Sequence, residues 1–121
     1  MTNKQGKIWG ETTEILSSPY ISIHYLSIKK GGYCSEHYHE NKFNYFFVIS
    51  GKLEITIYRD HGHKKAKDIT ILDAGKETNI DPGFYHKFRA LTNVECLEIY
   101  TPVELSEDIV RRSTGGLNEK K

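Results

Sequence analysis

The chain has 121 residues, which fits one domain and excludes a two-domain organisation. Lys and Arg total 17 and Asp and Glu total 16, leaving a formal charge of +1 without any block of one sign, so nucleic acid is a poor candidate partner. No apolar run approaches the roughly 20 residues of a membrane span, and the polar start does not resemble a secretory signal. We therefore expect a cytoplasmic protein that binds neither nucleic acid nor a membrane.

Short apolar and aromatic segments bounded by turn residues predict an all-β fold, because their side chains alternate with the period of a strand. The predicted strands cover residues 20–28, 34–39, 45–49, 53–58, 68–72, 78–80, 86–90 and 94–101. An open antiparallel sheet of this length would leave its edges exposed to other chains. The pattern therefore favours a closed barrel or a sandwich.

The C-terminal part of the chain carries the only helical pattern. Residues 106–112 predict a short helix, with Ser106 as its N-cap and two acidic residues in its first turn. Residues 113–121 are polar and contain two glycines, which is typical of a flexible tail. We expect one domain over residues 1–112, including an N-terminal strand segment, followed by this tail.

Three histidines form the candidate metal site. His37 and His39 are two positions apart, so on a strand their side chains leave the same face about 7 Å apart along the chain. His86 follows a Pro-Gly turn and opens another strand. Neutral imidazole is a common ligand for borderline metals. We expect one divalent ion, which could be Zn, Fe, Mn or Ni. The second His-x-His pair, at residues 61–63, lies in a charged connection and is interpreted as a solvated hairpin tip.

The order of glycines and histidines resembles the two sequence motifs of the cupin superfamily. The first motif is matched by Gly31, His37, His39, Asn44 and Gly51, and the second by Gly75, Pro82 and His86. The resemblance implies a small cupin barrel, that is, a double-stranded β-helix or jelly roll. It also implies Asn44 as the fourth metal ligand, where the family usually has Glu. A neutral amide oxygen is a weaker ligand than a carboxylate.

A closer resemblance, over most of the chain, is to the cupin domain of type II mannose-6-phosphate isomerases. Residues 35–51 align with that domain without a gap, although the family typically has Gln where this chain has His37 and Glu where it has Asn44. The nucleotidyltransferase domain that often precedes that cupin is not part of this chain. The resemblance implies a sugar or a sugar phosphate as ligand and aldose–ketose isomerisation as activity.

Three hypotheses for function remain open. A metal ion held by the histidines could polarise a sugar carbonyl, with Glu98 as a candidate general base. Alternatively, the barrel is a binding module without catalysis, which Asn44 and the lack of an evident base favour. The third hypothesis is an iron-dependent dioxygenase, because His-rich cupin sites also perform oxygen chemistry.

Residues around the histidines are candidates for ligand binding. If Asn44 points inward, Phe46 shares its face by strand parity and would line the pocket. Lys42 and Lys87 are close in sequence to the candidate metal ligands and could bind a phosphate or a carboxylate, although surface charge is the default interpretation.

The predicted strand at residues 45–49 also indicates a homodimer. Tyr45 and Phe47 would face outward while Phe46 faces inward, so the strand is apolar on both faces. Burial of both faces would require a partner subunit, and we expect a second copy of this chain in that role.

Overall fold

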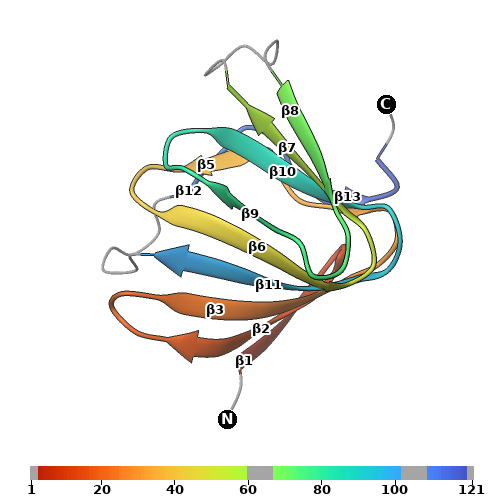
Figure 1. Ribbon diagram of the computed structural model, residues 1–121, viewed down its shortest axis with the longest axis horizontal. Coiled ribbons are helices and arrows are strands. Elements are labelled where there is room, and N and C mark those ends of the chain that lie inside the picture. Colours follow the sequence, from red (N-terminus) through yellow and green to blue (C-terminus); the bar gives the residue numbers. More distant parts are fainter. Residues whose placement is uncertain (1–2, 60–66, 102–108, 120–121) are drawn as a thin grey trace.

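The computed structural model describes residues 3–59, 67–101 and 109–119, which form two antiparallel sheets that face each other around a common core (Figure 1). The first sheet has the strand order β1 (Asn3–Lys7), β2 (Gly10–Ser17), β3 (Ser22–Ile28), β11 (Val94–Thr101), β6 (Phe43–Ser50) and β9 (Glu77–Ile80). This all-β architecture confirms the predicted fold class. No helix in the described ranges is long and apolar enough to cross a membrane.

The second sheet is built around β10 (Tyr85–Ala90). One edge of β10 pairs with two short strands in turn, β5 (His37–His39) and β4 (Gly32–Tyr33). Its other edge pairs with β7 (Leu53–Tyr58), which continues to β8 (Lys67–Leu72). Short strands β12 (Ile109–Arg111) and β13 (Gly116–Leu117) extend β5 and β4 respectively.

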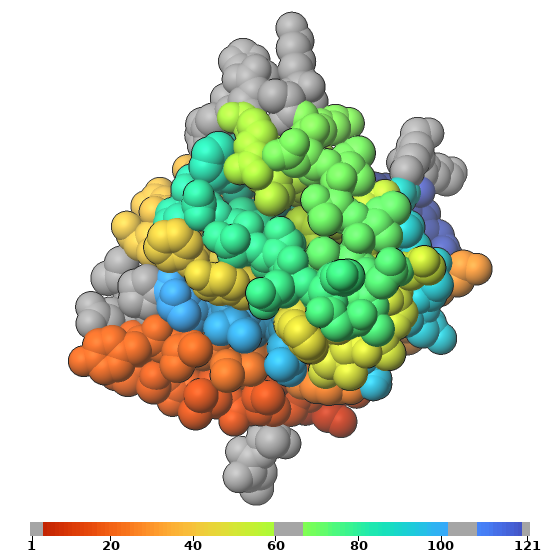
Figure 2. All heavy atoms as spheres, viewed as in Figure 1, coloured from red at the N-terminus to blue at the C-terminus, as the bar shows by residue number. Residues whose placement is uncertain are grey.

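The core lies between the sheets and follows the alternation of side chains along the strands. In β6, Phe46 and Val48 are buried, whereas Tyr45 and Phe47 are 37% and 36% exposed, as strand parity predicts. Atoms of β3, β11 and β6, coloured orange, blue and yellow, lie at the surface of the face drawn in Figure 2. The buried hydrophobic cluster contains Leu26, Ile28, Cys34, Phe46, Val48, Leu53, Ile55, Ile57, Leu72, Ile80, Phe88, Ala90, Val94 and Cys96.

The C-terminal helix predicted over residues 106–112 is not found. Residues 106–108 lie outside the described residues, and Ile109–Arg111 form β12, which pairs with β5. The helix prediction is therefore wrong for Ile109–Arg111, whose backbone pairs with the strand that carries His37. Beyond residue 112, Gly116–Leu117 pair with β4; the domain boundary at residue 112 itself stays a prediction.

The N-terminal strand segment forms a hairpin, for which the sequence pattern gave no strand ranges before residue 20. β1 and β2 pair along their whole length, and β2 continues the first sheet beside β3. These strands are rich in Thr, Glu, Lys and Gln and lack the apolar alternation from which strands are recognised. Their place at the edge of the sheet explains this composition, because an edge strand covers less of the core.

Candidate metal centre and adjoining cavity

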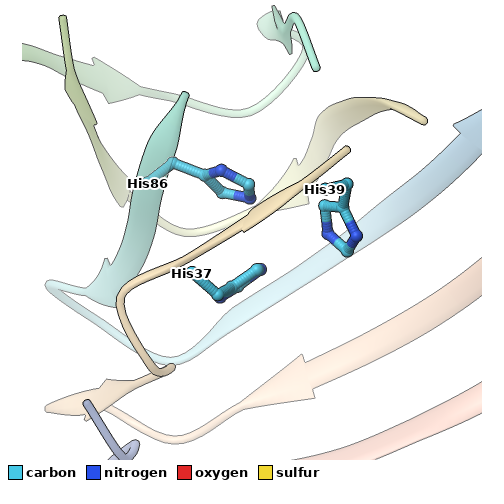
Figure 3. A group of neighbouring side chains, drawn as sticks. All are labelled: His37, His39 and His86. Carbon is cyan, nitrogen blue, oxygen red and sulfur yellow. The ribbon is translucent and has the colours of Figure 1, made fainter. Parts of the chain in front are cut away.

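His37, His39 and His86 come together between the two sheets. His37 and His39 lie on β5, and His86 of β10 is directly opposite His37 in the strand register. One ring nitrogen from each residue lies within 4.8 Å of the others, and all three side chains are buried. Figure 3 shows the three rings directed toward one another from these two strands. The predicted cluster is confirmed, and it could hold a metal ion.

Backbone carbonyls fix the tautomers of two of these rings. His37 Nδ1–H donates to the Ser35 carbonyl at 2.7 Å, and His86 Nδ1–H donates to the Phe84 carbonyl at 3.0 Å. With the proton on Nδ1, the lone pair of each ring is on Nε2. Such carbonyl contacts orient imidazoles that ligate metals. Each acceptor lies two residues before its histidine, so the local chain supplies the orientation.

Burial keeps these histidines neutral. Desolvation lowers the pKa of His37 to about 4, despite the Ser35 carbonyl, and the nearby His39 and Arg111 lower it further. Desolvation also lowers the pKa of His86 well below its usual range, with His37 as the next contributor. At neutral pH both rings therefore offer lone pairs, which is the state that a metal requires.

Asn44 connects the histidine cluster to Glu98. Its side chain is fully buried, and its amide nitrogen donates to His86 Nε2 at 3.2 Å and to Glu98 Oε2 at 3.3 Å. Its Oδ1 is buried and has no hydrogen-bond partner in the described part of the chain. The side chain thus lies where a fourth ligand would be expected, but the amide nitrogen, rather than the oxygen, meets His86.

Glu98 and Tyr100 stand on β11 beside this cluster. Burial raises the pKa of Glu98, while hydrogen bonds from Tyr100 and Asn44 oppose the rise. Burial likewise raises the pKa of Tyr100 well above its usual range, and the adjacent Glu98 contributes. The Tyr100 ring also packs against His39, with ring centroids 5.1 Å apart. Glu98 is therefore a carboxyl group held within hydrogen-bonding contact of the candidate metal site.

A cavity of about 530 Å³ opens next to the cluster and reaches it at His37. Its walls come from β1, β2, β3 and β11 on one side and from β12 and the segment before β5 on the other. The lining residues are Gln5, Lys7, Trp9, Thr12, Glu14, His24, Cys34, Ser35, His37, Phe88, Glu98, Tyr100, Ile109, Arg111, Thr114 and Gly115. The N-terminal hairpin thus supplies one wall of a chamber that adjoins the histidines.

The predicted ligand-binding residues occupy different places. Asn44 is in contact with the cluster, but Phe46 packs in the core, with its ring centroid 6.0 Å from that of Phe88. Lys42 has its Nζ 6.0 Å from the centroid of the Tyr100 ring. The Lys87 ammonium is 2.7 Å from Glu119. Neither lysine lines the cavity, and a ligand-binding role for them stays a prediction.

Lys87 belongs to a group of charges on the outer side of β5. Glu36, which is only 7% exposed, accepts a hydrogen bond from Arg112 Nε at 3.1 Å and lies 3.8 Å from Lys87 Nζ. The Arg112 guanidinium also covers the Tyr85 ring at 3.8 Å. These contacts attach the residues after β12 to the barrel. Three side chains that flank the histidines, those of Glu36, Tyr85 and Lys87, take part in these contacts.

Sequence reasoning did not predict several charged or titratable groups of the cavity, namely Lys7, Glu14, His24, Tyr100 and Arg111. His24 is partly buried, which lowers its pKa. Arg111 fell inside the predicted helix. Only a correct topology could have found these residues, because β1, β3 and β12 are far apart in the sequence. The second His-x-His pair, at residues 61–63, lies outside the described residues.

Comparison with known proteins agrees with this architecture. The model of the cupin domain family matches residues 24–100. Oxalate decarboxylase from Bacillus subtilis, solved at pH 4.6, superposes with a TM-score of 0.78 at 20% identity, covering 91% of this chain and 30% of that one. No curated protein matches the chain.

Two further solved structures show the same likeness. CapF with the inhibitor 3-isopropenyl-tropolone has a TM-score of 0.78 at 19% identity, covering 94% of this chain and 34% of that one. A B. subtilis oxalate decarboxylase structure described for its Mn(II) centres has a TM-score of 0.73 at 19% identity, covering 87% and 28%. The chain spans about a third of the length of these proteins, and identities this low establish the fold alone.

Proposed function

Since this chain belongs to the cupin family, we propose that it binds one divalent metal ion through His37, His39 and His86 and transfers a proton within a small carbonyl compound. The observation that carries the proposal is the buried histidine cluster beside a carboxyl group, Glu98, at the end of a ligand-sized cavity. Mannose-6-phosphate isomerase-like aldose–ketose isomerisation is the specific form of this chemistry that the sequence resemblance supports.

The donor set fits a metal ion of the borderline class. Three neutral imidazoles suit Zn, Fe, Mn or Ni, and the Nδ1 contacts of His37 and His86 leave their Nε2 lone pairs for coordination. The Mn(II) centres of the structurally similar oxalate decarboxylase make Mn a necessary member of any metal screen. When bound, such an ion supplies Lewis acidity that polarises a carbonyl oxygen.

Glu98 is positioned to exchange the proton. Its Oε2 accepts from the Asn44 amide, which holds the carboxyl group between the cluster and the cavity. Tyr100 hydrogen-bonds to the same carboxyl group and restricts the orientations that the Glu98 side chain can adopt. A carboxyl group fixed in this way can take a proton from one carbon of a bound substrate and return it to the neighbouring carbon, as isomerisation requires.

The test measures metal content and proton exchange separately. Untagged protein is analysed for bound metals, with His37→Ala and His86→Ala as variants and His24→Ala as the matched control outside the cluster. Metal-loaded protein is then incubated in D2O with sugar phosphates, including mannose 6-phosphate, and deuterium incorporation at carbon is followed by NMR. We expect one metal per chain, loss of metal in the cluster variants only, and exchange that Glu98→Gln abolishes.

A non-catalytic binding module is the second candidate, and the hydrogen bond from Asn44 to His86 favours it. The amide donates to the Nε2 lone pair of His86 that a metal would use, so this ring has a partner without an ion. Ligand-dependent thermal stabilisation without any deuterium incorporation would support this function over catalysis. Negligible metal in the wild type, unchanged by His37→Ala, would reject the metal proposal. Oxygen consumption on iron loading would instead indicate a dioxygenase.

A further inference from the structure

Two positively charged side chains line the cavity from opposite walls. Arg111 of β12 is directly opposite His37 in the strand register, so both side chains leave the same face of the second sheet. Lys7 closes β1 and lines the facing wall, where it pairs in register with Gly10. The two cations therefore meet the same chamber from opposite sheets.

The charges of Lys7 and Arg111 are not neutralised by direct contacts. Within residues 3–59, 67–101 and 109–119, neither side chain forms an ion pair or a hydrogen bond, and both are exposed. Two carboxyl groups, those of Glu14 and Glu98, also line the cavity.

We propose that Lys7 and Arg111 bind the anionic group, a carboxylate or a phosphate, of a small molecule that fills the cavity and extends toward His37. The planar guanidinium of Arg111 matches two oxygens of either group, and the Lys7 ammonium adds a second charge from the facing wall. The chemistry of the other end of this molecule, near His37, rests on the proposed function. The anion site at Lys7 and Arg111 does not require a metal ion.

The dimensions and chemistry of the chamber suit such a ligand. Its volume of about 530 Å³ is in the range typical of small-molecule sites. Trp9, Phe88 and Ile109 provide apolar contact surface, whereas Thr12 and Gln5 offer hydrogen-bonding groups. A small molecule with a polar body and one anionic end would match the hydrogen-bonding groups with its body and the two cations with its charged end. A neutral molecule would leave the two cations without a counterpart.

The test uses pairs of probes that differ in charge. Calorimetric titrations compare mannose 6-phosphate with mannose, and malonate with malonamide, on protein treated with EDTA and on Mn-loaded protein. Lys7→Met and Arg111→Met remove the charges. Arg111→Lys keeps a positive charge but loses the planar guanidinium that can contact two oxygens. Lys76→Met removes an exposed lysine outside the cavity and is the matched control. The phosphate and carboxylate pairs identify which anion the site prefers.

We expect an anionic probe to bind more tightly than its neutral partner, with or without metal, and binding to weaken as salt is raised. Each charge-removing variant should weaken anion binding about fivefold, and Lys76→Met should leave it unchanged. Equal affinity in the wild type and in the Lys7 and Arg111 variants would overturn the proposal, as would a lack of anion binding altogether. Metal content, measured on the same samples, shows independently whether the proposed metal function fails.

Discussion

The Asn44 amide nitrogen lies 3.2 Å from Nε2 of His86, so a hydrogen-bond donor occupies the position from which the family's carboxylate would approach a metal ion. The same amide group contacts Glu98, while its oxygen is buried without a hydrogen bond among the described residues. Metal binding would require this side chain to turn its oxygen inward or to remain outside the coordination shell. We therefore expect Asn44 to set how tightly the cluster would hold an ion.

Asn44→Asp should tighten metal binding and destabilise the metal-free protein. The substitution keeps the shape of the side chain, adds a charged ligand, and removes the donor to His86 and Glu98. We expect at least a tenfold gain in Mn or Zn affinity and a loss of about 2 kcal/mol in metal-free unfolding free energy. Competition with a chelator and urea denaturation in EDTA measure the two effects. Asn79→Asp, at an exposed position, is the control; unchanged affinity in Asn44→Asp would contradict the expectation.

Metal-free protein should lose stability as the pH falls through the histidine range. The native pKa of His37 is about 4, below the unfolded value near 6.5, so the unfolded chain binds a proton that the native chain does not. This contribution is fully present above pH 6.5 and is lost progressively down to pH 4, amounting to about 3 kcal/mol. His86 acts in the same direction. Urea unfolding in EDTA between pH 7.5 and 4.5 measures the slope, which His37→Gln should reduce.

The sequence was sufficient for the barrel and the cluster because both depend on local patterns. Alternation located the inner strands, and the spacing of His37 and His39 placed both rings on one face. It was not sufficient for the cavity. Lys7 lies on an edge strand whose polar composition carries no strand signal, and Arg111 ends a three-residue strand, Ile109–Arg111, that follows a capping pattern typical of a helix. Which side chains share a chamber is decided by pairing between distant segments.

Gly51→Ala should be more destabilising than Gly75→Ala. Both glycines have positive φ, at 88° and 85°, so a Cβ strains the backbone of each by about 1 kcal/mol. At Gly51 the added Cβ would also collide with the Asn93 carbonyl, whereas at Gly75 nothing lies within 4 Å. Urea denaturation of the two variants isolates the collision from the conformational strain. Equal losses of unfolding free energy would show that the turn at Gly51 relaxes.

The homodimer expected from the sequence has a defined test. Tyr45 and Phe47 of β6 lie opposite Ile99 and Leu97 of β11, which gives the first sheet an apolar outer face. If a second copy covers this face, Phe47→Glu should shift sedimentation from dimer to monomer at micromolar concentration. Ile71→Glu, on the exposed side of β8, is the matched control. A monomeric wild type would reject the expectation.

The cavity joins segments from nearly the full length of the chain, since β1 forms one wall and β12 the other. A ligand held by Lys7 and Arg111 would act as a reversible cross-link between these segments. Closing so long a loop costs chain entropy, and a cross-link that exists only in the native state opposes the detachment of either strand. Occupancy of the cavity should therefore appear first as slower hydrogen exchange in β1 and β12, before any change in the buried core.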